Sequence, residues 1–345
     1  MEKHKKQLKN TVFSDSRMDM KILKIRLVNF KRFTDLLIDH IPSNSKLVLL
    51  IGSNGSGKSS LFDAFGFIDA SIKDDVGRNE IFWNYFRKKS DTPVSVTLSL
   101  DHQDDFTLTD KQFNKPSPAS TAFYGRTSFR QIPRLTRTAL GQGGTFDFEK
   151  DSDRPKFFIE RDSRFENDVE KMTEIILKDF FRSNQSHEQI TQKYINPINA
   201  ALNNIFGGND GTKLQLVEII PPLEGKVAQI GFRKGNSDIH YNYLSAGEKE
   251  VFNLLLNLLS RKSFYQDTIY FLDEMDLHLN TKLQFNFIKE ITENWIPESC
   301  QLWTATHSLG FIEYAKQVDF ASILDFDDLD FDVPRYLVYF PKLHC

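Results

Sequence analysis

Apolar residues along the chain fall into short runs that predict β-strands and longer runs that have helical spacing. Residues 45–52 (SKLVLLIG) are dominated by a continuous apolar stretch, which is typical of a strand buried on both faces of a sheet. Residues 21–33 alternate apolar with basic residues, as expected of an edge-like strand. The segments 93–101 and 105–110 predict an antiparallel pair, so the N-terminal part is expected to contain an antiparallel β portion.

Helical spacing dominates the middle of the chain. Residues 165–181 and 190–206 predict helices, and one face of the first is expected to carry Val169, Met172, Ile176 and Phe180. Helices and strands then alternate: helix 247–260, strand 268–274, helix 282–294, strand 300–308, helix 309–316 and strand 320–326. Such alternation predicts an α/β fold, with a mixed sheet flanked by helices.

These patterns divide the chain into four segments. Residues 1–10 are basic and are not followed by the apolar h-region of a signal peptide, so we expect a disordered leader over residues 1–20 and no secretory signal. The other segments are an N-terminal lobe at 21–110, a basic loop with a helical insert at 111–210, and a C-terminal lobe at 211–345.

Composition narrows the classes of protein. The formal net charge of −3 gives no overall attraction to nucleic acid or acidic membranes. Two cysteines, Cys300 and Cys345, cannot build a disulfide framework, and this favours a reducing, cytoplasmic location. No apolar run reaches the roughly 18–20 residues of a membrane span, so we expect no membrane partner.

The segment that follows the apolar run 45–52 has the pattern of a P-loop. Gly52–Ser59 (GSNGSGKS) fits G-x-x-x-x-G-K-[ST] between a predicted strand and a predicted helix. The glycines let backbone N–H groups surround phosphate oxygens, and the helix N-terminus favours the same anion. A glycine-rich turn that matches by chance is the alternative. We predict that ATP and Mg²⁺ bind here, with Lys58 on the β- and γ-phosphates, Ser59 on the metal, and the phosphates held by Asn54, Gly55, Ser56, Gly57, Lys58, Ser59 and Ser60.

Acidic residues end a second buried strand. Asp273 closes the predicted strand 268–274 and is expected to hold Mg²⁺, while Glu274 is placed to orient or deprotonate the attacking water. His307 ends a later strand and is interpreted as a sensor of the γ-phosphate. The alternatives are an ordinary strand end and a structural histidine.

Another turn has the character of an anion site. Leu244–Glu250 (LSAGEKE) is a polar turn containing glycine, and it leads directly into an apolar helix. The N–H groups at such a helix start can bind phosphate.

The order of P-loop, serine-glycine turn, Asp-Glu pair and histidine resembles the ABC-type ATPases. The resemblance implies an ABC-type P-loop NTPase head with a helical insert between the P-loop and the signature turn. It also implies that Ser245 and Gly247 contact ATP held by a partner subunit, so that two ATP molecules hold a homodimer together. Met275 and Asp276 match the start of the D-loop. Lys31 and Arg32 match a strand end that lies near the α-phosphate or base in this family.

The match to the ABC pattern has departures. The signature has Ala246 and Glu248 where the family commonly has glycine and glutamine. The glutamine of the family's Q-loop is matched only by Gln131, in a segment that resembles the preceding strand.

The segment between Lys58 and Ser245 is longer than in transporter ATPases and lacks the coiled coils of chromosome-organising members. Its length, with SAGEKE and DEMDLHLN, resembles the RecF/OLD-like group of the SMC/ABC superfamily. This resemblance implies an ATP-gated switch in DNA repair or anti-phage defence, as a dimer or higher oligomer, controlling a separate effector such as a nuclease or toxin. The acidic run 325–332 is interpreted as a solvated loop. A transporter subunit and a non-hydrolysing ATP-binding scaffold are the alternatives.

Arginines and aromatics alternate in the basic segment 111–146. This composition suits phosphate contacts and base stacking. Arg126 is expected to point at the nucleotide, and the candidates for DNA or partner contacts are Arg130, Arg134 and Arg137. The equal alternative is that these arginines line the ATP site or pair with acidic helices.

Overall fold

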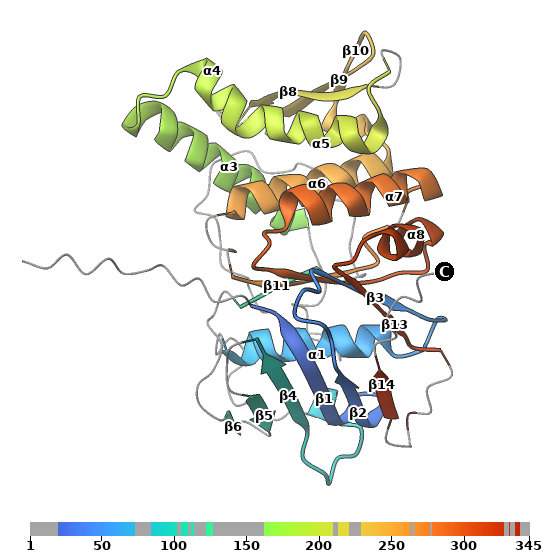
Figure 1. Cartoon of the computed structure of the whole chain (residues 1–345). Helices are drawn as coiled ribbons and strands as arrows, with labels where there is room; N and C mark the ends of the chain where they lie inside the picture. The colour runs from blue at the N-terminus through green and yellow to red at the C-terminus, as the bar shows by residue number, and fades with distance from the viewer. Residues whose placement is uncertain are drawn as a thin grey trace, which may run out of the picture.

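In the residues that it describes, the computed structural model contains three β-sheets with helices between and around them (Figure 1). It describes residues 20–72, 84–101, 105–109, 112–113, 122–126, 162–209, 213–220, 229–262, 265, 267–276, 278–327, 331 and 335–338. The predicted disordered leader and most of the basic segment lie outside these residues, and the division of the chain into four segments stays a prediction.

The sheets differ in how their strands pair. A six-stranded sheet is antiparallel except at β14, in the order β14 (Arg335–Val338), β2 (Phe33–Asp39), β1 (Ile22–Phe30), β4 (Ser95–Leu100), β5 (Phe106–Thr109) and β6 (Gln112–Phe113). A five-stranded parallel sheet has the order β13 (Ala321–Asp325), β3 (Leu47–Ile51), β12 (Gln301–Ala305), β11 (Ile269–Asp273) and β7 (Phe123–Arg126). A three-stranded antiparallel sheet has the order β10 (Ser237–His240), β9 (Gln229–Lys234) and β8 (Leu214–Ile220).

The helices form layers on the parallel sheet (Figure 1). One face is covered by α1 (Lys58–Ile72), which lies between the parallel and the six-stranded sheets. The other face is covered by α6 (Ala246–Arg261), α7 (Thr281–Glu290) and α8 (Leu309–Gln317). The three-stranded sheet lies beyond them with α3 (Asp162–Arg182), α4 (His187–Ile190) and α5 (Asn196–Phe206). The predicted α/β fold, with a mixed arrangement of strands flanked by helices, is confirmed.

Strand β3 explains why its sequence is continuously apolar. Leu47 and Leu49 belong to the hydrophobic cluster on the α6 side, whereas Val48 and Leu50 belong to the cluster on the α1 side. All four are fully buried, because successive side chains of a strand point to opposite faces and both faces are covered here.

The predicted strand 21–33 forms, but its edge-like placement is wrong. Strand β1 pairs with β2 on one side and β4 on the other. Alternation of apolar and polar residues reports a solvated face of a sheet, and it says nothing about whether both edges of the strand are paired. The predicted antiparallel pair is confirmed as β4 and β5.

The middle helices follow the predicted spacing until their ends. Val169 and Met172 are buried in α3, but Phe180 is 49% exposed, so the expected single apolar face is wrong for the last turn. The predicted helix 190–206 divides into α4, a π-helical turn at Thr191–Ile195, and α5. Pro197 lies at the start of α5, where its missing N–H interrupts a continuous α-helical ladder.

Candidate nucleotide site

Three neighbouring parallel strands bring the predicted site segments to one edge of the sheet. The register sets Leu50 of β3 opposite Ala305 of β12, and Ala305 opposite Asp273 of β11. The P-loop follows β3, His307 lies two residues after β12, and Glu274 follows Asp273 directly. Ligands of parallel α/β sheets bind at the carboxyl ends of the strands. The fold thus brings the P-loop, the acidic pair and His307 together.

The P-loop itself has a backbone that requires glycine. Gly57 has a φ of +99°, and an added Cβ there would lie 2.7 Å from Cζ of Phe33. A side chain is therefore excluded both by the conformation and by the close approach of the β2 ring. Helix α1 begins at the next residue, so its N-terminal N–H groups point to the same place.

The ammonium group of Lys58 lies inside the P-loop. Its Nζ donates to the carbonyl oxygens of Gly52 at 2.5 Å and Ser53 at 2.9 Å. Burial lowers the pKa of Lys58, although the nearby carboxylates of Asp273, Asp327 and Glu274 act in the opposite direction. A partly desolvated cation ringed by carbonyls and N–H groups is suited to binding an oligophosphate.

The acidic pair is shaped by the turn after β11. Asp273 ends the strand and is 3% exposed. Glu274 has a φ of +48°, a strained value for a residue other than glycine, and its N–H donates to the Ala305 carbonyl at 3.1 Å. This turn ends the strand immediately after Asp273.

Hydrogen bonds link the segment around His307 to the predicted D-loop. The hydroxyl of Thr306 donates to Oδ2 of Asp276 at 2.6 Å, and it accepts from the Ser308 N–H at 2.8 Å. Ser308 also caps α8 through the Phe311 N–H. His307 is held between these fixed residues, and its own side chain is exposed at the edge of the sheet.

A fourth acidic residue belongs to this edge and was missed from the sequence. Asp327 follows β13, and its Oδ1 accepts from the Ser53 N–H of the P-loop at 2.5 Å. That hydrogen bond lowers the pKa of Asp327, as do the charges of Lys58 and His307. Asp327 is exposed, in agreement with the interpretation of run 325–332 as a solvated loop, but that interpretation did not predict its contact with the P-loop. The available signal was that strand 320–326 would end beside the P-loop if it paired with β3.

The structure separates the two basic residues expected near the nucleotide. Arg32 donates to the Gly55 carbonyl of the P-loop, and its guanidinium lies 5.5 Å from the ring centre of Phe331. Lys31 instead lies 3.6 Å from Asp63 of α1 and 3.0 Å from the ring centre of Tyr85. Arg32 thus contacts the P-loop, whereas Lys31 contacts Asp63 and Tyr85.

The signature turn begins helix α6. Ser245 is the N-cap and forms a capping box with Glu248, in which each side chain bonds to the other residue's N–H. The Ser245 side chain is at the surface, whereas Gly247 is buried. The second predicted anion turn thus exists as a regular, capped helix start.

Gly247 is close to the backbone that follows the D-loop. A Cβ at this position would lie 2.7 Å from the carbonyl oxygen of His278 and 2.9 Å from Leu279. The carbonyl oxygen of His278 belongs to the backbone, so a change of side-chain rotamer cannot make room for a Cβ at position 247. This contact joins the signature turn to the D-loop within one chain.

Replacing Gly247 with alanine should therefore destabilise the protein by about 1–3 kcal/mol through overpacking. Urea unfolding of the nucleotide-free protein measures this change. Ala246→Ser, one residue earlier, is the control and should shift stability by less than about 0.5 kcal/mol. Equal stability of the Gly247→Ala variant and the wild type would show that the two turns separate easily.

Arg126 contacts the signature helix. Its Nη2 lies 3.8 Å from Oε1 of Glu250, and both side chains are 10% exposed. On β7, Arg126 is the register partner of Leu272, the residue before Asp273. The arginine expected to face the nucleotide thus links α6 to the strand that carries the acidic pair.

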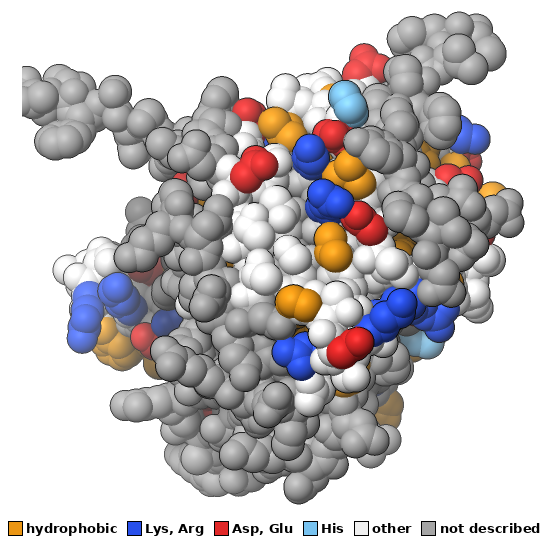
Figure 2. All heavy atoms as spheres, turned by 90° about the horizontal axis from the view of Figure 1, so that it is seen from below, with side chains coloured by type: hydrophobic (Ala, Val, Ile, Leu, Met, Phe, Trp, Pro, Cys, Tyr) orange, Lys and Arg blue, Asp and Glu red, His pale blue; other side chains and the backbone are white. Residues whose placement is uncertain are grey.

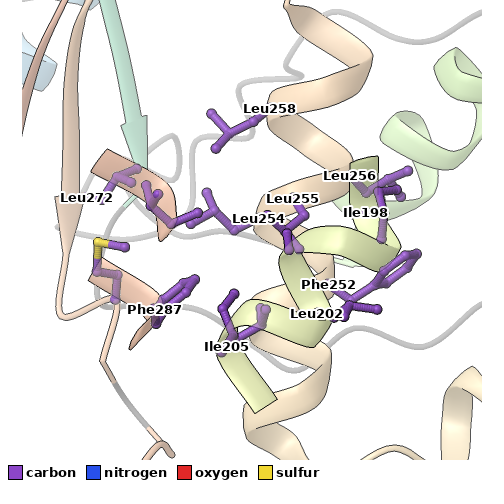
Figure 3. Packing of buried hydrophobic residues seen from close by; sticks show 14 of the residues in the cluster. Ile198, Leu202, Ile205, Phe252, Leu254, Leu255, Leu256, Leu258, Leu272 and Phe287 are labelled. Atoms are coloured by element: carbon purple, nitrogen blue, oxygen red, sulfur yellow. The ribbon is translucent and has the colours of Figure 1, made fainter. Parts of the chain in front are cut away.

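Hydrophobic packing reinforces the same link. Figure 3 shows Leu272 of β11 facing Leu254 and Leu258 of α6, with Phe287 of α7 beside them. The position of Asp273 is thereby fixed by the helix that begins with the signature turn.

The remaining basic candidates, Arg130, Arg134 and Arg137, and the Q-loop candidate Gln131 lie outside the described residues. On the described part of the face in Figure 2, Lys and Arg side chains lie among acidic and apolar ones.

Two basic residues of β1 have their charges compensated within the six-stranded sheet. Arg26 lies 2.6 Å from Asp35, and Lys24 lies 3.6 Å from Asp39. These residues therefore add little uncompensated positive charge for DNA.

The oxygen ligands suit a magnesium ion that accompanies a nucleotide. Among the described residues, no group of three or more His, Cys, Asp or Glu side chains could hold a metal ion. Mg²⁺ needs fewer protein ligands when phosphates and water supply the rest. The hydroxyl of Ser59, at the start of α1, and the carboxylate of Asp273 fit this role.

The strand–loop–helix arrangement at this edge of the sheet defines the chain as a P-loop protein. A family model described as "AAA domain, putative AbiEii toxin, Type IV TA system" matches residues 47–313, and the chain belongs to this family. A second model, described as "P-loop containing region of AAA domain", matches residues 22–68. A search of curated proteins found no match.

Three solved structures similar to the chain are head domains of SMC proteins. One, an SmcHead bound to the C-winged helix domain of ScpA, is 15% identical with a TM-score of 0.53, over 93% of this chain and 98% of that chain. An SMC head domain from Thermotoga maritima is 16% identical with a TM-score of 0.45, over 94% and 99%. An Smc head domain with an extended coiled coil, bound to the C-terminal domain of ScpA derived from Pyrococcus furiosus, is 15% identical with a TM-score of 0.49, over 89% and 93%.

These findings confirm the predicted SMC/ABC-type fold and leave the RecF/OLD-like subgroup a prediction. In the parts of the chain that the structure describes, no helix has the length and apolar character required to cross a membrane.

Proposed function

We propose that the protein hydrolyses ATP and forms a homodimer around two ATP molecules, and that this cycle switches a separate effector in anti-phage defence or DNA metabolism. The observation that carries the proposal is the register of β3, β12 and β11, which aligns the P-loop, His307 and the Asp273–Glu274 pair at one edge. The capped signature turn adds a second phosphate-binding helix start.

Each residue has a defined task in the proposed reaction. Lys58 and the P-loop N–H groups bind the phosphates and oppose the charge that develops on the γ-phosphate. Ser59 and Asp273 would hold Mg²⁺, which neutralises phosphate charge. Glu274 orients water and accepts its proton, and the His307 side chain contacts the γ-phosphate from the neighbouring strand end.

The signature turn is proposed to act across the dimer. Ser245 lies at the surface and is the N-cap of a helix, and the positive end of a helix dipole favours an anion, so this turn can meet a phosphate on another molecule. Within its own chain, this turn is packed on the D-loop through Gly247. The signature turn is therefore packed against its own chain at Gly247 and exposed to solvent at Ser245.

The test of this proposal is the molecular mass of the protein in solution with Mg²⁺ and a slowly hydrolysed ATP analogue. The wild type should change from monomer to dimer, and Ser245→Arg should remain monomeric while it still binds the analogue. The arginine fills the space in front of the helix start without touching the P-loop. A wild-type protein that stays monomeric at saturating analogue would contradict the shared-ATP dimer.

Two findings support an effector. The family description names a putative toxin of a TA system, and the similar SmcHead structure contains a bound winged-helix domain of another protein. Protein that co-purifies at equal stoichiometry with the ATP-bound dimer from native cells should be a nuclease or a toxin. Recovery of DNA alone would favour a repair protein that acts without an effector.

A further inference from the structure

The side chain of Glu248 holds the signature serine. Its Oε2 accepts hydrogen bonds from both the N–H and the hydroxyl of Ser245, each at 2.8 Å. The N–H of Glu248 in turn donates to the Ser245 Oγ at 3.3 Å. The hydroxyl that would donate to a phosphate in the proposed dimer is therefore beside a carboxylate.

That carboxylate is compensated by one lysine. Nζ of Lys234 lies 2.6 Å from Oε1 of Glu248, whose side chain is 10% exposed. Burial alone would raise the pKa of Glu248, but the hydrogen bonds from Lys234 and Ser245 outweigh it and lower the pKa. Glu248 thus carries a negative charge, and each of its two oxygens has a partner.

Lys234 is held in place by the strands around it. It ends β9, where its register partners are Ser237 of β10 and Leu214 of β8. The hairpin turn follows at Gly235, and β10 then leads through Tyr241–Tyr243 into the signature turn. The three-stranded sheet and the signature are therefore consecutive in the chain and joined again by the Lys234–Glu248 pair.

We infer that Lys234 is a positioning residue for the signature turn. It neutralises the carboxylate of Glu248, so that Ser245 and the start of α6 can bind the phosphates of ATP held by a second copy of the chain. This inference rests on the proposed function. Without the lysine, a carboxylate adjacent to the Ser245 hydroxyl repels the incoming phosphate and retains the hydroxyl proton. A glutamine at position 248 keeps the capping box and has no charge, so it removes the need for Lys234.

The experiment measures the dimer dissociation constant with saturating Mg-ATP, in chains that all carry Glu274→Gln to prevent turnover. Lys234→Met should weaken the dimer by about 30- to 100-fold, since each of two signature turns contributes a repulsion. Glu248→Gln should dimerise as tightly as the parent. The double variant Lys234→Met/Glu248→Gln should recover to within about threefold of the parent, because the repelling charge is absent.

The control is Arg233→Met, which removes a cation from the same hairpin. Arg233 lies 2.9 Å from the exposed Asp238 and has no contact with the capping box, so the dimer should be unaffected. ATP binding by the isolated monomers, measured at low protein concentration, should be equal in all variants because the P-loop is unchanged. Thermal unfolding identifies any variant that is misfolded.

Two results would overturn the inference: a Lys234→Met dimer as tight as the parent's, or a Lys234→Met defect that Glu248→Gln does not relieve. A parent that binds ATP and never dimerises would instead overturn the proposed function, and the inference with it. Whether the parent protein dimerises therefore distinguishes failure of the proposed function from failure of this inference.

Discussion

Lys58→Met should weaken ATP binding by about 100-fold or more, because it removes the cation that we propose makes charge-assisted contacts with the β- and γ-phosphates. Methionine keeps most of the length of the side chain and has no charge. The stability of the nucleotide-free protein should not fall, because burial lowers the pKa of Lys58 and its charged form therefore opposes folding. Titration of a fluorescent ATP analogue measures the affinity, and thermal unfolding measures the stability.

Lys46→Met is the matched control for this prediction. Lys46 immediately precedes β3, at the end opposite the P-loop, and it pairs with Glu298 at 2.5 Å. Its replacement should leave ATP affinity unchanged. If Lys58→Met bound ATP as tightly as the wild type, the phosphates would have to bind elsewhere, and the P-loop assignment would be wrong.

Glu274→Gln should slow ATP hydrolysis by about 100- to 10,000-fold, which is the usual contribution of a general base. The amide keeps the size of the side chain and cannot accept the proton of the attacking water. ATP binding should persist, so the ATP-bound dimer should accumulate. Phosphate release and the molecular mass in solution measure the two effects on the same sample.

Glu293→Gln is the corresponding control, because it makes the same chemical change on an exposed side chain in the π-helical turn after α7. Its hydrolysis rate should equal that of the wild type. A normal rate in Glu274→Gln would show that another group activates the water, and Asp327 is the nearest alternative on structural grounds because it contacts the P-loop.

The sequence predicts the parts of the site that depend on residues close together along the chain. The P-loop is a continuous motif, and Asp273, Glu274 and His307 each end a strand that its apolar run makes recognisable. The carboxyl ends of parallel strands meet at one edge of a sheet. Once the strands are predicted, the residues that follow them are therefore predicted to lie together. The structure confirms those strands as β3, β11 and β12.

The features that the sequence did not predict depend on partners distant along the chain. Asp327 meets Ser53 only because β13 pairs with β3, and nothing in an acidic run specifies that neighbour. Nothing in the sequence distinguishes Lys234 from other lysines, because its contact with Glu248 depends on the β9–β10 hairpin. The wrong edge-like placement of β1 has the same origin, because the partners of a strand are set by the fold as a whole.

Asp327 and Phe331 give the nucleotide site a boundary different from that of the family match. The match ends at residue 313, yet Asp327 accepts from the first turn of the P-loop and Phe331 packs 5.6 Å from the Phe33 ring, which closes over Gly57. Residues beyond the matched region therefore contact the P-loop near Ser53 and pack beside Gly57. A fragment cut at residue 313 would keep every predicted motif and lose these two contacts, so a fragment that preserves the surroundings of the P-loop should extend at least to Phe331.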